Sequence, residues 1–413
     1  MNTPTDGPRP PAATSVGRRG LLGMVGSGLA GAGVGALGGV AAASALGEEA
    51  PPVVRAGATV SPYGPHQPGI ALPATAVTET VALDLLPEVA RRHDRAELAR
   101  LMRVLTGSIA SLTQGRGAPG DPTPWLASAG ADVSVTVGLG ATFFEEGWDL
   151  PRPPGWMRVP AMRHDELDEA WTGGDLVWVV GGRDGTTVGH VVRRLVADAA
   201  PFATVRWRQN GTWNGFGADG EAVTGRNLFG QVDGSANPQP GTRLFDTTVW
   251  IDGGPWMGGT TLVVRRIRMD LATWDSLTRD EQEASVGRRL DDGAPVTGGG
   301  EFDDVDLNAR KDGEYVVALE SHVRRSHPAM HGQKRIFRKG GNYEVHGPEG
   351  SEAGLVFASY QANLGAQFVP LQVSLDQGDL LNEWTTAIGS AEFAVLPGFE
   401  EGEWLGQGLL ADS

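Results

Sequence analysis

The chain has 413 residues, of which 40% are hydrophobic, so it is long enough to bury one large core or two moderate ones. Its 34 basic and 50 acidic residues give a formal net charge of −16, which disfavours binding to nucleic acid or to an anionic membrane surface. The absence of cysteine excludes disulfide bonds and any metal or cluster site built on thiolates.

The N-terminus has the pattern of an export signal. Arg18 and Arg19 precede residues 20–45, a stretch that contains no charged residue and ends in Ala-Ser-Ala. This pattern is typical of a cleaved secretory signal, and the paired arginines indicate the twin-arginine route. The alternative is a transmembrane anchor, because the stretch is long enough to span a bilayer, but its many glycines make a poor permanent span. We therefore predict a signal peptide over residues 1–45 and a mature extracellular or cell-envelope protein without a membrane span.

The next part of the chain predicts an α+β unit. Residues 46–75 are rich in Pro, Gly and Ala and are expected to form an extended lead-in. After them, strand, helix, strand, strand, helix and strand are predicted at 76–85, 94–112, 132–139, 175–180, 188–198 and 202–208. The alternating valines of 132–139 predict a half-buried strand. This order of elements is that of a ferredoxin-like unit.

A second series of elements follows. It comprises a strand at 260–269, a helix at 279–289, a strand at 355–361, a helix near 379–387 and a strand at 391–396. The repetition predicts two ferredoxin-like halves with antiparallel sheets, 76–220 and 221–413. We place their boundary in the Gly- and Asn-rich connection between Asn210 and Leu228.

Three segments of the second half carry candidate chemistry. Gly230-Gln231-Val232-Asp233-Gly234 places a carboxylate on a glycine-flanked turn that a flat ligand can approach closely. The other two are Ser321-His322-Val323-Arg324-Arg325-Ser326-His327-Pro328 and Arg335-Ile336-Phe337-Arg338-Lys339-Gly340. In this order and spacing they resemble the dye-decolourising peroxidases, which carry a GxxDG segment, a haem-ligating histidine in an HxRRxxP-like segment and an arginine in an RxxRxG-like segment. Similar stretches at 63–67, 262–269, 281–288 and 354–361 extend the resemblance from about residue 60 onwards and indicate the exported branch.

The resemblance implies a dimeric α+β barrel-like peroxidase fold that binds haem b in its C-terminal half. It implies an enzyme that reduces H2O2 and oxidises organic one-electron donors such as dyes and phenolics, with a homo-oligomer as a possible assembly. His322 is the implied iron ligand. His327 and His331 are four residues apart and offer an alternative metal pair, but Pro328 between them disfavours a regular helix.

The resemblance also implies roles for residues around the haem. Asp233 is expected to move a proton between the peroxide oxygens, and Arg338 to stabilise charge as the O–O bond breaks. Without the other two segments, Asp233 would read as a simple turn cap. Gln231 replaces an aromatic residue found in many relatives and would leave a more polar pocket. Cofactor contacts are further implied for Leu355 and Phe357, which an apolar core strand would explain nearly as well, and for Arg324, which would meet a propionate.

One feature departs from the family pattern. Peroxidases give the second ring nitrogen of the ligating histidine a carboxylate acceptor, yet residues 321–338 contain no acidic side chain. The acceptor must come from elsewhere, with Asp376, Asp379, a carbonyl or water as candidates. This departure and Gln231 keep two alternatives open, a deferrochelatase-like handling of haem iron and a non-catalytic haem carrier.

Overall fold

The computed structural model describes residues 59–128, 132–145, 147–348 and 350–411. The predicted signal peptide and the first part of the predicted lead-in, residues 46–58, lie outside these ranges. In the part of the chain that the structure describes, no helix is both long enough and apolar enough to cross a membrane.

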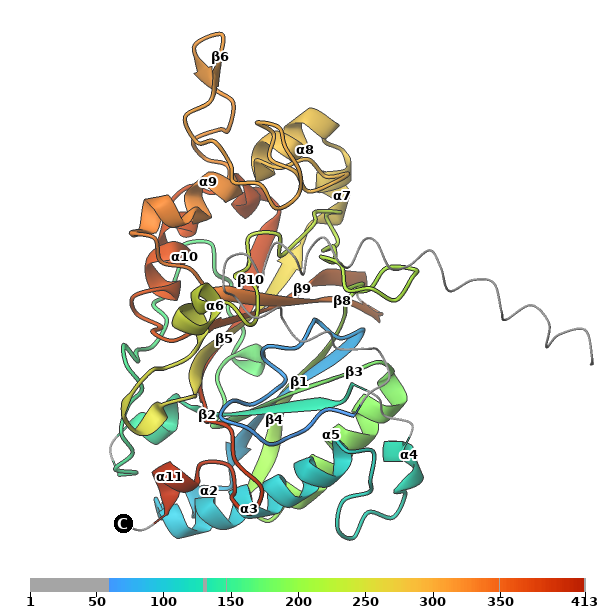
Figure 1. Ribbon diagram of the computed structural model, residues 1–413, viewed down its shortest axis with the longest axis vertical. Coiled ribbons are helices and arrows are strands. Elements are labelled where there is room, and N and C mark those ends of the chain that lie inside the picture. Colours follow the sequence, from blue (N-terminus) through green and yellow to red (C-terminus); the bar gives the residue numbers. More distant parts are fainter. Residues whose placement is uncertain (1–58, 129–131, 146, 349, 412–413) are drawn as a thin grey trace, which may run out of the picture. The chain divides into compact units, whose positions relative to one another are not determined.

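The N-terminal half has the predicted ferredoxin-like order (Figure 1). Its main elements are β1 (Val77–Leu85), α3 (Arg95–Leu112), β2 (Ser134–Gly140), β3 (Leu176–Gly182), α5 (Gly185–Ala199) and β4 (Ala203–Thr212), with the short helices α2 (Pro87–Ala90) and α4 (Trp125–Ser128). The strands pair antiparallel in the order β4-β1-β3-β2. Helix α3 begins where predicted because Asp94 caps it, its side chain accepting from the backbone N–H groups of Ala96 and Glu97.

Strand β2 corrects one prediction. Every residue of β2 is buried, so it is not the half-buried strand that its valines predicted. Val135 and Val137 pack in the core shared with α3 and α5, whereas Ser134 and Thr136 line a polar cavity on the opposite face of the strand. Both faces are therefore covered.

The C-terminal half repeats the topology. It contains β5 (Thr260–Met269), α7 (Leu271–Asp275), α8 (Arg279–Val286), α9 (His322–Ser326), β8 (Phe337–Gly347), β9 (Gly350–Gln361), α10 (Phe368–Asp376) and β10 (Thr385–Val395). The hairpin of β6 (Arg310–Lys311) and β7 (Glu314–Tyr315) projects from it, and α6 (Arg243–Val249) and α11 (Gln407–Leu410) complete the described α-helices (Figure 1). The sheet order is β10-β5-β9-β8, which confirms the predicted α+β class with antiparallel sheets.

Two element predictions in this half were wrong. Strand β8 was not predicted, and in place of the helix expected near 379–387 there is only a short 3-10 helix, Leu380–Glu383, between the end of α10 at Asp376 and the start of β10 at Thr385. Polar and glycine residues in β8 hide its strand character, and a register irregularity between Ala387 and Gly389 interrupts the alternation of β10.

The described strands of the two sheets join edge to edge into a closed barrel. Strand β10 pairs with β2 at Phe393–Gly140 and its neighbours, and β4 meets β8 at Thr212–Asn342. At the second seam the backbones approach so closely that a Cβ atom on Gly211 would lie 2.8 Å from the Cα atom of Gly341. This seam therefore needs glycine.

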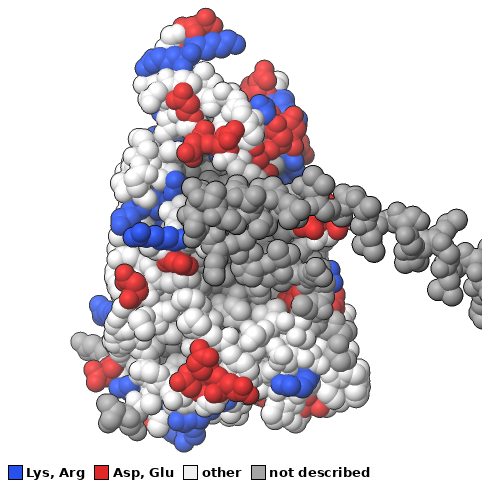
Figure 2. Space-filling model, in the orientation of Figure 1, with Lys and Arg blue, Asp and Glu red and all other residues white. Residues whose placement is uncertain are grey.

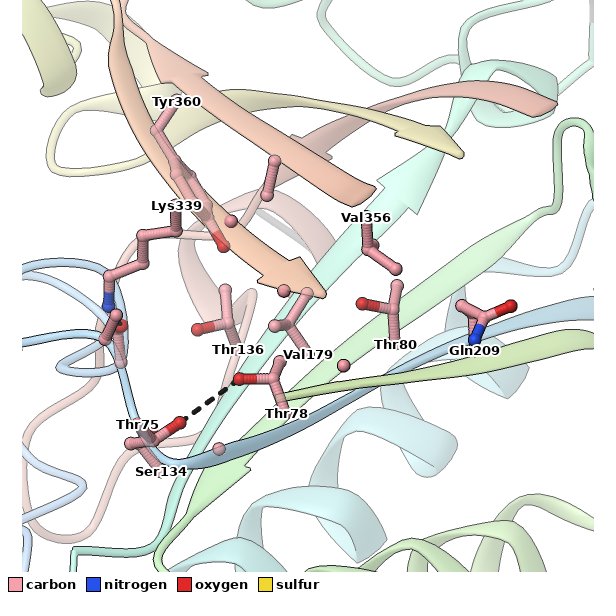
Figure 3. A pocket seen from close by; sticks show the side chains of 17 residues that line it. Thr75, Thr78, Thr80, Ser134, Thr136, Val179, Gln209, Lys339, Val356 and Tyr360 are labelled. Carbon is pink, nitrogen blue, oxygen red and sulfur yellow. Dashed lines mark hydrogen bonds between the residues drawn. The ribbon is translucent and has the colours of Figure 1, made fainter. Parts of the chain in front are cut away.

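A small polar cavity lies inside the barrel (Figure 3). Its volume is about 40 Å³, large enough for ordered water. Lys339 lines it and donates from Nζ to the carbonyl oxygen of Gly69 at 2.6 Å, and the hydroxyl of Tyr360 points into it. None of the described residues that line it is acidic, and burial lowers the pKa of Lys339 from 10.5 to about 7.

We expect Lys339→Met to stabilise the protein at pH 6 and to lose this advantage as the pH rises. The pKa of Lys339 is lower in the folded state than in the unfolded state. Burial of the charged ammonium therefore lowers the free energy of unfolding of the wild type, and this penalty has its full size below about pH 7. The penalty disappears as the pH approaches 10.5. Thermal unfolding of both proteins across this range measures it. Lys311→Met on the exposed strand β6 is the control, and a Tm difference independent of pH would contradict the prediction.

Acidic side chains gather on the end of the molecule that carries α8 and the segment after it (Figure 2). Exposed members of this group are Asp280, Glu281, Asp291, Asp292, Asp303, Asp304 and Asp306. This surface thus carries part of the overall negative charge beside a cavity of the C-terminal half, which Asp304 also lines.

Candidate active site

The principal cavity of the described chain lies against one face of the C-terminal sheet. Its volume is about 260 Å³. All four strands contribute to it, with Arg338 from β8, Leu355 and Phe357 from β9, Arg265, Ile267 and Met269 from β5, and Thr385 and Ala387 from β10. The strand register aligns several of these, since Ile267 pairs with both Leu355 and Ala387. The sheet therefore forms a wall with Arg338 at one edge and β10 at the other.

His322 lies in the cavity wall as the first residue of α9. Its Nδ1 atom lies 2.5 Å from Oδ2 of Asp379, and the Asp379 side chain is only 4% exposed. The second carboxylate oxygen of Asp379 accepts from the backbone N–H of Leu381 at 3.0 Å, which fixes the acid. Burial opposes protonation of His322, but the charge and hydrogen bond of Asp379 raise the pKa of the imidazole above its usual value. With Nδ1 engaged, Nε2 is the ring nitrogen left for a ligand.

Asp379 resolves the question of the missing acid. It follows His322 by fifty-seven positions in the sequence, so the short motif could not reveal it. Asp376, the other candidate, instead accepts from the backbone N–H of His164 and contacts Nδ1 of the same residue, both at 3.1 Å.

The glycine-flanked turn and β8 bring Asp233 and Arg338 together. Gly230 and Gly234 have φ values of 80° and 129°, which favour glycine. Nη1 of Arg338 lies 3.4 Å from Oδ1 of Asp233. Asn237, on the same turn, accepts from the backbone N–H of Arg338 at 3.1 Å and donates to its carbonyl oxygen at 2.8 Å, so it locks β8 to the turn.

Gln231 shares a hydrogen-bond partner with Asp233. Asn227 Nδ2 donates both to Oε1 of Gln231 at 3.0 Å and to Oδ2 of Asp233 at 3.2 Å. The buried Nε2 of Gln231 has no hydrogen-bond partner among the described residues, although Gln231 lines the cavity. A buried donor of this kind indicates that a ligand or water completes the site.

The prediction for Arg324 is not supported. Arg324 does not line the cavity, and its guanidinium donates to the backbone carbonyl oxygens of Val317, Ala318 and Leu307. Arg324 therefore holds the segment before α9 in position through these backbone contacts. Besides Arg265 and Arg338, the cations that line the cavity are Arg288, Lys334 and Arg335; the side chains of Lys334 and Arg335 make no hydrogen bond or ion pair with any described residue.

The alternative metal pair is also not supported. His327 accepts through Nδ1 from the backbone N–H of Ala329, and His331 Nε2 lies 2.6 Å from the carbonyl oxygen of Arg325. No group of three or more His, Cys, Asp or Glu side chains in the described ranges is arranged to hold a metal ion.

Comparison with known proteins identifies the class. The family models for the N-terminal and C-terminal parts of Dyp-type peroxidases match residues 67–213 and 224–400. The chain therefore belongs to the Dyp-type peroxidase family, and the protein is an enzyme, a haem-dependent peroxidase.

Particular relatives agree with this assignment. The dye-decolorizing peroxidase of Thermobifida fusca (strain YX) is 38% identical over 86% of this chain and 85% of its own. A deferrochelatase of Escherichia coli (strain K12) is 31% identical over 84% of this chain and 86% of its own. Among solved structures, the DyP-type peroxidase from Cellulomonas bogoriensis has a TM-score of 0.80 and 42% identity, with 86% of this chain and 99% of that chain covered. The DyP-type peroxidase from Streptomyces coelicolor has a TM-score of 0.80 and 36% identity, covering 88% of this chain and 100% of that chain.

The residues of the cavity fit haem. His322 offers an imidazole nitrogen that no described carboxylate occupies, Gln231 offers an unpaired buried donor, and Arg335 offers an unpaired cation for a carboxylate group. Leu355 and Phe357 supply apolar contact area on the sheet. The four groups come from α9, the glycine-flanked turn, the residues before β8, and β9.

Proposed function

We propose that the protein binds haem b and that His322 would ligate its iron. The His322–Asp379 contact of 2.5 Å carries this proposal, because a carboxylate on the second ring nitrogen orients a ligating histidine and makes it more basic. Non-covalent haem b is favoured because the chain has no cysteine for covalent attachment. Arg335, with Lys334 and Arg288 nearby in the wall, would hold the propionates.

Asp233 and Arg338 have different roles in the reaction with H2O2. Haem, when bound, supplies the redox chemistry that reduces H2O2 to water. The Asp233 carboxylate takes the proton from one peroxide oxygen and returns it to the other, which then leaves as water. Arg338, 3.4 Å from that carboxylate, places a permanent positive charge where negative charge develops during O–O cleavage. Asn237 and Asn227 hold these two side chains in position.

The electrons come from organic donors such as phenolics and dyes. The test is to mix haem-loaded protein with one equivalent of H2O2 in a stopped-flow spectrometer and then add a donor panel. We expect a rapid spectral change on mixing and its return with the donors. Slow bleaching without return would support a haem carrier instead.

Deferrochelatase activity is a second candidate, because the E. coli protein of that name is 31% identical over most of both chains. It would release iron and leave the porphyrin intact. Porphyrin fluorescence after incubation with haem and a reductant distinguishes the two activities. The oriented His322–Asp379 pair favours peroxidase chemistry, since a basic axial ligand retains the iron.

We also propose export by the twin-arginine route, with cleavage close to Ala45. The support is Arg18-Arg19 before the uncharged stretch 20–45. Replacing both arginines with lysine is expected to leave the precursor inside the cell, as seen by fractionation and immunoblotting. The matched control replaces Arg9 with lysine, and normal export of the double variant would contradict the proposal.

A further inference from the structure

The polar cavity inside the barrel is separate from the cavity at the candidate active site. No described residue lines both. Strand alternation explains the separation, because neighbouring residues of a strand point to opposite faces of the sheet. On β8, Arg338 lines the candidate active site and Lys339 lines the barrel cavity, and on β9 Phe357 and Ala358 divide in the same way.

Hydroxyl groups from both halves of the chain gather around the barrel cavity. The strand register brings Thr80 of β1 and Thr136 of β2 to either side of Val179 on β3, and Ser134 lies on the same face of β2. Tyr360 of β9 adds a hydroxyl group from the C-terminal half (Figure 3). These four hydroxyl residues are between 1% and 4% exposed, and none of their hydroxyl groups makes a hydrogen bond with any described residue. Because buried polar groups are stable only with a partner, the four hydroxyl groups are available to a group bound in the cavity.

Lys339 adds a positive charge to this cluster. Its Nζ atom has three N–H donors, of which one is used by the carbonyl oxygen of Gly69 at 2.6 Å. No acidic residue in the described ranges lines the cavity or pairs with Lys339. Burial raises the pKa of Tyr360 above its usual value, so the phenol keeps its proton and remains a donor. The cavity therefore combines a cation with several hydrogen-bond donors and has no negative charge of its own.

We propose that the barrel cavity binds one small monovalent anion, such as chloride or bromide, between Lys339 and the surrounding hydroxyl groups. The anion accepts from Nζ and from the hydroxyl groups of Thr80, Ser134, Thr136 and Tyr360. It supplies the counter-charge that a buried ammonium requires. The cavity volume of about 40 Å³ holds roughly three water-sized spheres, which suits a halide and excludes an organic anion of the size of gluconate.

This anion would join the two halves of the chain. Lys339 and Tyr360 belong to the C-terminal half, whereas Thr80, Ser134 and Thr136 belong to the N-terminal half. An anion that binds only the folded barrel must stabilise it. The inference concerns stability and ligand binding, and it does not depend on haem or on the proposed peroxidase function.

The first test measures the Tm of the haem-loaded protein at pH 6 while sodium bromide replaces sodium gluconate. The ionic strength is kept constant, so the screening of surface charges does not change. We expect the wild-type Tm to rise by about 2–4 °C, the order of shift for a ligand at about ten times its Kd. Lys339→Met should show no such rise, so its stability advantage at pH 6 should be smaller in bromide than in gluconate.

Lys311→Met on the exposed strand β6 is the control for this test and should respond to bromide as the wild type does. Bromide that binds the haem iron instead would raise the Tm of all three proteins equally. Equal rises in the wild type and in Lys339→Met would therefore overturn the inference.

The second test removes one hydroxyl group and keeps the lysine. Thr136→Val replaces the hydroxyl by a methyl group of similar size, and we expect the Kd for bromide, from the bromide dependence of Tm, to become about fivefold weaker, as for one lost hydrogen bond. Thr204→Val is the matched control, because Thr204 is exposed on β4 and does not line the cavity. An equal Kd in the two threonine variants would contradict the assigned contacts.

Anomalous diffraction from a bromide-soaked crystal locates the ion directly. We expect a peak within hydrogen-bond distance of Nζ of Lys339 in the wild type and no peak there in Lys339→Met. A wild-type cavity that holds only water under these conditions would overturn the inference.

Discussion

Asp233→Ala is expected to slow the reaction with H2O2 by about 10²–10⁴-fold, the range for loss of a proton-transfer group. Arg338→Leu is expected to slow it by about 10²–10³-fold, the range for loss of a preorganised charge. Both residues act before any donor is oxidised. Haem content and the later reaction with donors should therefore change little in either variant. Stopped-flow mixing with H2O2 at several pH values measures the rate constant.

Two exposed residues provide matched controls for these variants. Asp252→Ala and Arg310→Leu remove the same groups at exposed positions that do not line the cavity. Wild-type rate constants in both distal variants would show that the mechanism is wrong. A normal rate in Asp233→Ala alone would move proton transfer to water beside Gln231, which shares the Asn227 amide with Asp233.

His322→Ala is expected to purify largely without haem. The imidazole is the proposed iron ligand, and the nearby histidines are poor replacements because His331 Nε2 contacts the carbonyl oxygen of Arg325 and His327 Nδ1 accepts from a backbone N–H. The ratio of haem to protein, from absorbance and total iron, measures the loss. His331→Ala is the matched control.

Asp379→Asn separates ligation from orientation. It keeps His322 but removes the charged acceptor, so haem should be retained with about 10–100-fold lower affinity or activity, the usual effect of losing such a partner. An unchanged haem spectrum in His322→Ala would show that another residue ligates the iron.

The fold was predictable where local pattern and packing agree. Helix α3 has both a capping Asp94 and an apolar stripe, and β5 is an unbroken run of strand-forming residues, so each lies where expected. Strand β8 was missed because Lys339, Gly340 and Gly341 read as a loop. In the structure the two glycines allow Trp213 and Gly211 to approach closely. The Lys339 side chain lines the cavity inside the barrel.

The site was predictable only as far as short motifs reach. Asp233, His322 and Arg338 lie in recognisable segments, and the structure brings all three to one cavity together with Gln231, Leu355 and Phe357. Asp379 and His164 contribute through pairings between segments far apart in the sequence, which no local pattern encodes. Arg324 is the reverse case, since it lies in the motif but its side chain contacts backbone carbonyl oxygens and does not line the cavity.

Asp165 ties the two halves into one cofactor-binding unit. It pairs with Arg265 of β5, and both side chains are buried, at 7% and 3% exposure. Without a folded N-terminal half, Arg265 would lose its counter-charge and the cavity would lack the lining that Met162, His164 and Asp165 supply. The cavity that would hold haem is therefore complete only when both halves are folded. The two family-model regions are accordingly repeats of one fold rather than separable modules, and neither carries the complete pocket alone.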